Sequence, residues 1–171
     1  TGYGRKNVAF AQQAVNEVIC DIQGARFMFG PSVRTIIDMG GQTSKVIKCT
    51  EWGRASDFFV NDKCATGFGR GIETMAQLLQ IPITEMGELS LKVEKDPEPV
   101  STTCYVFADT QAVGLLRAGA KENDALAAYL FAVAYRLYTL AGRMKIEKEV
   151  AFIGGLAKNV GVAKRLEREL K

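Results

Sequence analysis

The chain has 171 residues, of which 47% are hydrophobic and 24% charged, and its formal net charge is +3. This composition predicts a single globular domain of ordinary soluble type, and so small and scattered a charge argues against nucleic acid or an anionic membrane surface as a partner. The sequence contains no histidine, which excludes Ser-His-Asp and Cys-His catalytic arrangements and every histidine-ligated metal site.

The apolar segments and the cysteine spacing of the sequence indicate a cytoplasmic protein. The longest apolar run, residues 125–135, is too short to span a membrane, and the N-terminus lacks the apolar segment of a signal peptide. The four cysteines include no C-x-x-C pair, so we expect neither a zinc ribbon nor a thioredoxin-type motif. The chain starts without methionine and ends inside a charged helical pattern, so we expect both ends to continue in a longer protein.

The first part of the chain predicts one helix and three strands. Apolar residues at helical spacing predict a helix over residues 11–24. Two strand-like segments, 33–39 and 44–49, flank Gly40-Gly41-Gln42-Thr43 and predict a β-hairpin. A third strand is expected over residues 56–60.

The second part of the chain is predominantly helical. The segment over 121–144 is apolar around much of its circumference, which predicts a central helix. A polar loop is expected over 92–99. We predict a short buried strand over 150–153 and helices over 69–80, 83–91, 106–118, 121–144 and 160–171.

Two cysteines lie where helices are expected to begin. Cys64 precedes a run with glycine at positions 67, 69 and 71, and Cys104 precedes the helix over 106–118. The positive end of a helix dipole favours the thiolate, which is the form that attacks or binds metal. Cys20 instead lies on a helical pattern and Cys49 in a strand, so we expect only Cys64 and Cys104 to be exposed on one face. The alternative for Cys64 is a small buried side chain in a glycine-rich turn.

Two further glycine turns have the character of nucleotide sites. Asp38 precedes Gly40-Gly41, which places a carboxylate and backbone N–H groups at one edge of a sheet, as a site for Mg²⁺ and phosphate requires. Gly154-Gly155 follows another strand and allows close backbone approach by a nucleotide. Each is also a common turn. No complete dinucleotide fingerprint or P-loop occurs.

Taken together, these motifs resemble a known family. The relevant segments are Thr1-Gly2-Tyr3-Gly4-Arg5, Ile37-Asp38-Met39-Gly40-Gly41-Gln42, Asn61-Asp62-Lys63-Cys64-Ala65, Ser101-Thr102-Thr103-Cys104, Val106-Phe107-Ala108 and Gly154-Gly155-Leu156-Ala157-Lys158-Asn159-Val160-Gly161. In this order they resemble the ATPases that activate 2-hydroxyacyl-CoA dehydratases and the ATP-hydrolysing subunits of benzoyl-CoA reductase.

The resemblance implies a fold and a nucleotide site. The fold would be α/β, with residues 1–171 forming one ribonuclease-H-like lobe of the actin-like ATPase type with a helical insertion, truncated at both ends relative to the family. Asp38 would be catalytic. The residues implied to bind ATP and Mg²⁺ are Gly40, Gly41 and Gln42 at the phosphate end, with Gly154, Gly155, Lys158 and Asn159 at the adenosine end.

The resemblance also implies an electron-transfer function. Cys64 and Cys104 would be metal ligands, and two subunits would supply four thiolates to one [4Fe–4S] cluster. The assembly would be a homodimer or paralogous heterodimer. Its partners would be an acyl-CoA dehydratase or reductase component and an electron donor such as ferredoxin or flavodoxin.

Some positions depart from the family pattern and leave alternatives open. The family's N-terminal phosphate loop is absent, Thr43 replaces the usual aspartate, and residues 66–71 vary around retained glycines and Arg70. One alternative is a sugar or N-acetylhexosamine kinase of the same superfamily. A kinase would need no paired cysteines, so the presence of Cys64 with Cys104 argues against it. Another is a non-catalytic assembly subunit, for which Thr43 is the only indication.

Overall fold

The computed structural model describes residues 1–2, 4–61 and 66–171. Tyr3 and most of the first cysteine motif, including Cys64, therefore lie outside the described residues. Among the described helices, none is long and apolar enough to cross a membrane.

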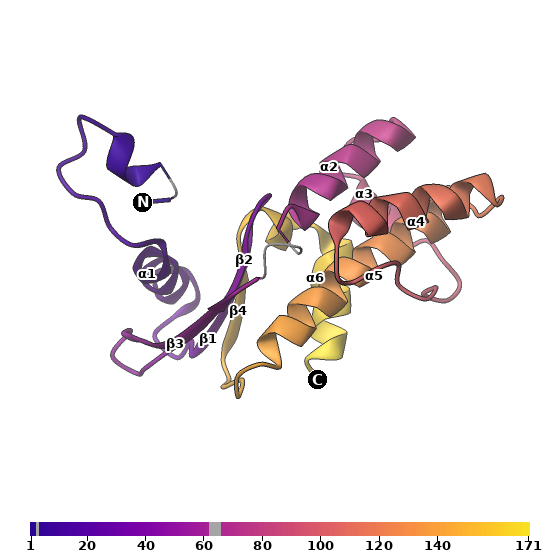
Figure 1. Cartoon of the computed structure of the whole chain (residues 1–171). Coiled ribbons are helices and arrows are strands. Elements are labelled where there is room, and N and C mark those ends of the chain that lie inside the picture. The colour runs from indigo at the N-terminus through magenta and orange to yellow at the C-terminus, as the bar shows by residue number, and fades with distance from the viewer. Residues whose placement is uncertain (3, 62–65) are drawn as a thin grey trace.

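One sheet divides the described molecule, with strand order β3-β2-β1-β4 (Figure 1). β1 (Thr35–Met39) pairs antiparallel with β2 (Ser44–Cys49), which pairs antiparallel with β3 (Ala55–Val60). β4 (Val150–Ile153) joins the other side of β1 as a parallel strand. The carboxyl ends of β1 and β4 consequently meet at the same edge of the sheet.

The predicted hairpin is confirmed. Met39 pairs with Ser44, and the turn over residues 40–43 is closed by a hydrogen bond from the Gly40 N–H to the Thr43 carbonyl at 3.0 Å. Below, residues 40–43 are called the β1–β2 turn.

The first long helix covers one face of the sheet, but its predicted position was wrong. α1 runs over Glu17–Phe29 rather than 11–24. It begins there because the Asn16 side chain accepts a hydrogen bond from the Val18 N–H at 2.9 Å, and it ends at Gly30, where φ is 102°. Gly24 does not end the helix and has open space around its Cα.

The other helices pack on the opposite face of the sheet (Figure 1). The bounds are Phe68–Leu79 for α2, Met86–Ser90 for α3, Tyr105–Arg117 for α4, Glu122–Ala141 for α5 and Val160–Glu169 for α6. Within the described residues, the short 3-10 helices η1 (Arg5–Asn7) and η3 (Gly155–Lys158) were not predicted. The other predicted helices are confirmed to within three residues at each end.

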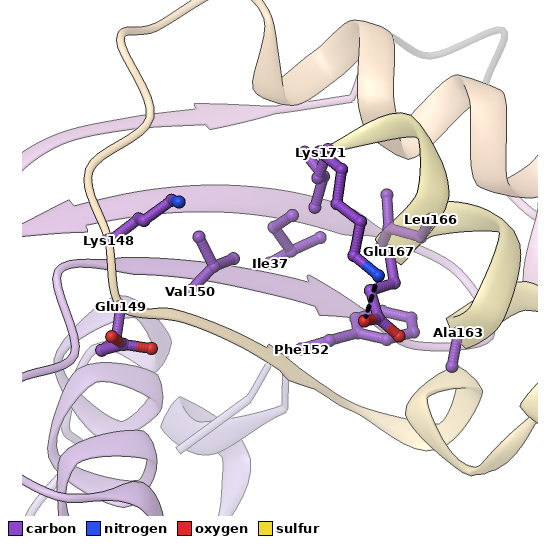
Figure 2. A pocket seen from close by; sticks show the side chains of 10 residues that line it. Ile37, Lys148, Glu149, Val150, Phe152, Ala163, Leu166, Glu167 and Lys171 are labelled. Atoms are coloured by element: carbon purple, nitrogen blue, oxygen red, sulfur yellow. Dashed lines mark ion pairs between the residues drawn. The ribbon is translucent and has the colours of Figure 1, made fainter.

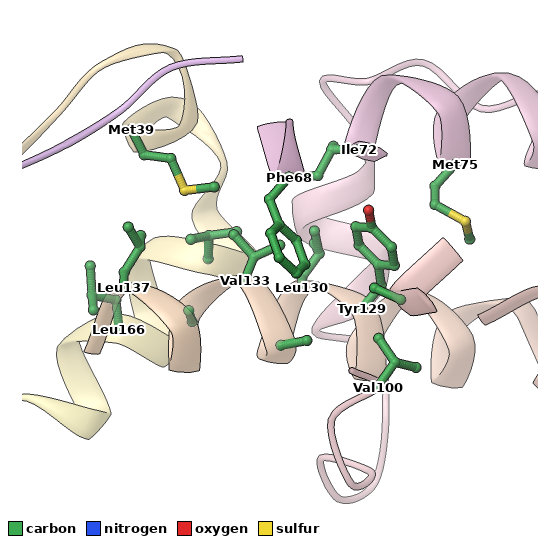
Figure 3. Packing of buried hydrophobic residues seen from close by; sticks show 14 of the residues in the cluster. Met39, Phe68, Ile72, Met75, Val100, Tyr129, Leu130, Val133, Leu137 and Leu166 are labelled. Carbon is green, nitrogen blue, oxygen red and sulfur yellow. The ribbon is translucent and has the colours of Figure 1, made fainter. Parts of the chain in front are cut away.

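The central position predicted for α5 is confirmed. Figure 3 shows Tyr129, Leu130, Val133 and Leu137 of this helix among Met39 of β1, Phe68, Ile72 and Met75 of α2, and Leu166 of α6. All of these side chains are buried. Because α5 contributes apolar side chains around much of its circumference, it joins the sheet, α2 and α6 into one core.

Candidate nucleotide site and cysteine face

Two of the predicted glycine turns meet at the carboxyl ends of β1 and β4. Asp38 pairs with Ile153 across the parallel ladder. Gly154, which follows β4, therefore lies beside the end of β1. Gly154 lies against Asp38 and Met39: a Cβ built on Gly154 would lie 2.6 Å from Asp38 Oδ1 and would overlap the Met39 carbonyl oxygen. Only glycine fits here, where φ is 90°.

The Asp38 carboxylate is bound on its other side by a buried lysine. Lys45 Nζ donates to Asp38 Oδ2 at 2.7 Å and to Asp21 Oδ2 of α1 at 2.9 Å, and it lies 3.2 Å from Glu17 Oε1. Lys45 is only 4% exposed. The two oxygens of Asp38 therefore have different surroundings, since Oδ2 is bound by the ammonium group and Oδ1 faces Gly154.

The carboxylates around Lys45 favour the charged form of its ammonium group. Burial alone would lower the pKa of Lys45, but hydrogen bonds to Asp38 and Asp21 raise that pKa above its ordinary value. Burial raises the pKa of Asp21, although the hydrogen bond from Lys45 opposes that change. Three carboxylates thus surround one ammonium group, and Asp38 is the member at the end of β1.

The β1–β2 turn presents its backbone next to Asp38. Gly41 and Gln42 are exposed, and Gly40 is half-buried. Exposed glycine backbone beside a carboxylate is an arrangement that can hold the phosphate groups of a nucleotide together with a divalent cation. The structure therefore brings the predicted residues Asp38, Gly40, Gly41 and Gln42 together with Gly154.

A hollow of about 220 Å³ contains the other predicted nucleotide residues. It is lined by Gly155, Leu156, Lys158 and Asn159 after β4, and by Ile72 of α2 with Ile83 and Thr84 between α2 and α3. An apolar hollow with a few polar groups suits a planar base. Asn159 also caps α6, where its side chain accepts a hydrogen bond from the Val162 N–H at 3.1 Å.

A second hollow lies away from these residues. It measures about 600 Å³ and is bounded by β1, β4 and α6 (Figure 2). Ile37, Val150 and Phe152 form its sheet side, and the Glu167–Lys171 ion pair lies at its α6 side. None of the predicted site residues lines it.

The described cysteines differ in their surroundings. Cys104 is the residue immediately before α4 and is half-buried, and its side chain makes no capping hydrogen bond. Cys49 is buried, and its Sγ donates to the Val33 carbonyl at 3.3 Å, as expected for a structural cysteine. Cys20 is half-buried like Cys104, so the expected difference in exposure holds for Cys49 but not for Cys20.

The segments that carry the two predicted metal ligands converge. Gly67, three residues after Cys64, lies against the first residue of α4: a Cβ on Gly67 would be 3.1 Å from the Tyr105 ring. Tyr105 directly follows Cys104. Within the described ranges no three His, Cys, Asp or Glu side chains cluster as a metal site would require.

Sequence reasoning missed the role of Lys45 and the apolar wall of the smaller hollow. Lys45 lies on the same face of β2 as the buried residues Ile47 and Cys49, so strand alternation could have placed it against α1. Ile83 and Thr84 carried no such signal, because they lie between helices and meet η3 only through the tertiary fold.

Comparisons with known proteins agree with the predicted family. The sequence model of the BadF/BadG/BcrA/BcrD ATPase family matches residues 1–171. The activator of lactoyl-CoA dehydratase from Anaerotignum propionicum is 41% identical over 100% of this chain and 65% of the relative. The (R)-2-hydroxyglutaryl-CoA dehydratase activating ATPase from Acidaminococcus fermentans is 40% identical over 99% of this chain and 65% of the relative.

A solved structure shares the fold. The activator of the 2-hydroxyisocaproyl-CoA dehydratase from Clostridium difficile with bound ADPNP superposes with a TM-score of 0.91 at 37% identity, covering 99% of this chain and 62% of that structure. The predicted α/β, ribonuclease-H-like fold is confirmed by this likeness. The chain spans less than two thirds of the length of each of these relatives.

Proposed function

We propose a function from the premise that this chain belongs to the BadF/BadG/BcrA/BcrD ATPase family, whose sequence model matches its whole length. The protein is an ATP-dependent one-electron donor that activates an acyl-CoA dehydratase or benzoyl-CoA reductase. Residues 1–171 supply one ribonuclease-H-like lobe of it. The family match favours this activator function over a sugar kinase of the same superfamily.

The contact between Gly154 and Asp38 is the observation that carries the ATP-binding part of the proposal. It joins the β1–β2 turn to the hollow lined by Gly155, Lys158 and Asn159. Ligands of open α/β sheets bind outside the carboxyl ends of parallel strands, which is where these residues lie. In the proposed site the phosphates lie along Gly40, Gly41 and Gln42, the base enters the hollow, and Asp38 orients Mg²⁺ or its water.

Cys64 and Cys104 hold the metal group in this proposal. The contact of Gly67 with Tyr105 supports their pairing, since it joins the segments next to the two cysteines. When bound, a [4Fe–4S] cluster supplies one-electron transfer at a low potential. Two subunits, identical or paralogous, each contribute two thiolates. Cys104 lies immediately before α4, so its side chain stands at the start of that helix.

The proposed partners follow from this chemistry. A ferredoxin or flavodoxin supplies the electron, and a dehydratase or reductase component in the cytoplasm receives it. The relatives' names as dehydratase activators support the second of these partners.

Iron content and the absorbance spectrum of anaerobically purified full-length protein test the metal part of the proposal. Cys104→Ala should lose the cluster absorbance and the iron, because two of four thiolates vanish from a symmetric dimer. Cys49→Ala is the matched control, since Cys49 is buried among apolar residues and should leave the iron content unchanged. Full iron content in Cys104→Ala would overturn the ligand assignment.

A further inference from the structure

The first turn of α2 rests directly on the β1–β2 turn, and a glycine makes this possible. A Cβ built on Gly69 would overlap the Gly40 carbonyl oxygen and lie 2.7 Å from Gly41 Cα. All three of the nearest atoms that it would meet, including the Gly41 carbonyl oxygen, belong to the backbone. Any side chain at position 69 would therefore displace the turn or the helix, because no flexible side chain is present to give way.

Two hydrogen bonds fix the same contact. The Gly67 N–H donates to the Gln42 carbonyl at 2.9 Å, and the Arg70 N–H donates to the Gly41 carbonyl at 2.9 Å. These donors belong to the start of α2, whose first N–H groups have no partner inside the helix. The β1–β2 turn thus supplies acceptors that the helix itself lacks, and the two segments are held backbone to backbone.

The neighbouring glycines attach α2 to the other helices. Gly67 lies against the Tyr105 ring at the start of α4. A Cβ on Gly71 would overlap the Tyr129 hydroxyl and lie 3.1 Å from Asp109 Oδ1. The Tyr129 hydroxyl of α5 donates to Asp109 of α4 at 2.6 Å. Glycine at every second position therefore permits three close contacts, each with a different part of the molecule.

We propose that this glycine run is the structural link through which the nucleotide state reaches Cys104 at the start of α4, and that Gly69 is its positioning residue. This inference rests on the proposed function. Occupation of the β1–β2 turn by a terminal phosphate shifts the turn, and the rigid contact at Gly69 moves the start of α2. The contact at Gly67 then passes the movement to Tyr105, the residue after Cys104. Coupling between the two sites follows from this continuous packing.

Substitution at Gly69 in the full-length protein tests the structural link. Gly69→Ala should keep its iron, but the change that Mg-ATP induces in the EPR spectrum of the reduced protein should shrink roughly fivefold or more, within the usual range of such couplings. Gly114→Ala is the matched control, because Gly114 lies in α4 with open space around its Cα. An ATP-induced change of wild-type size in Gly69→Ala would overturn the inference.

Hydrogen exchange in the wild-type protein gives a second test that does not depend on whether Gly69→Ala folds. Exchange with Mg-ADP is compared with exchange with a non-hydrolysable Mg-ATP analogue, peptide by peptide. Protection should change in peptides covering both 40–45 and 66–71. A change confined to 40–45 would overturn the structural link and leave the nucleotide site standing. No change in either peptide would contradict the proposed nucleotide site, and the inference with it.

Discussion

Lys45 Nζ lies 2.7 Å from Asp38 Oδ2, so the carboxylate at the end of β1 is oriented by a buried ammonium group. Lys45 is attached in turn to Asp21 of α1 on the same face of the sheet. The orientation of Asp38 in the proposed nucleotide site thus depends on α1, which packs on the face of the sheet opposite to helices α2–α6.

Replacing this lysine should destabilise the protein. Lys45→Met removes the cation and leaves Asp38 and Asp21 without a partner in a mostly buried position, which should cost about 3 kcal/mol or more in the free energy of unfolding. Lys48→Met is the control, since Lys48 pairs with the half-exposed Glu147 and its loss should cost much less. Urea denaturation of both variants measures the difference, and equal losses would contradict the role given to Lys45.

The Asp38 carboxylate should matter for ATP hydrolysis and not for the metal site. Asp38→Asn keeps the side-chain shape but weakens contact with Mg²⁺ or its water, so the ATPase rate should fall between roughly 10- and 100-fold. Iron content should match that of the wild type, because Asp38 belongs to β1 whereas Cys104 lies at the start of α4. An unchanged ATPase rate in Asp38→Asn would remove Asp38 from the proposed site.

The local parts of this site could be predicted from the sequence, whereas its long-range contacts could not. The hairpin around residues 40–43 follows from glycines between two β-branched segments, a signal contained within a few residues. The start of α1 was misplaced because the apolar spacing does not mark the cap at Asn16, which begins the helix at Glu17. The Lys45–Asp21 contact depends on how α1 packs on the sheet. The residue types at positions 21 and 45 do not by themselves indicate that the two side chains meet.

A buried ion pair outside the site should make the free energy of unfolding depend on pH. Arg165 of α6 is 2% exposed and bonds to Asp96, which Arg168 also contacts. Burial alone would raise the pKa of Asp96, but hydrogen bonds from Arg168 and Arg165 lower that pKa below its ordinary value of 3.8. Because the folded-state pKa is depressed, the stabilisation is present above pH 3.8 and is lost as the pH falls through the folded-state pKa.

Asp96→Asn should therefore lower the free energy of unfolding by about 3 kcal/mol at neutral pH, since it leaves a buried arginine without its counter-charge. The difference from wild type should shrink as the pH falls below 3.8. Glu169→Gln is the control, because Glu169 meets Arg168 only at 3.4 Å. Urea denaturation at neutral and acid pH measures both variants, and a difference independent of pH would refute the ion-pair explanation.

The central claim is that nucleotide controls electron delivery, and anaerobic electron transfer from the reduced full-length protein to its dehydratase or reductase partner tests it most directly. The transfer is followed with Mg-ATP, with Mg-ADP and without nucleotide, in the wild type and in Asp38→Asn. Our account predicts rapid transfer by the wild type only with Mg-ATP and strongly impaired transfer by Asp38→Asn. Equal transfer without nucleotide, or unimpaired transfer by the variant, would contradict an ATP-gated electron donor.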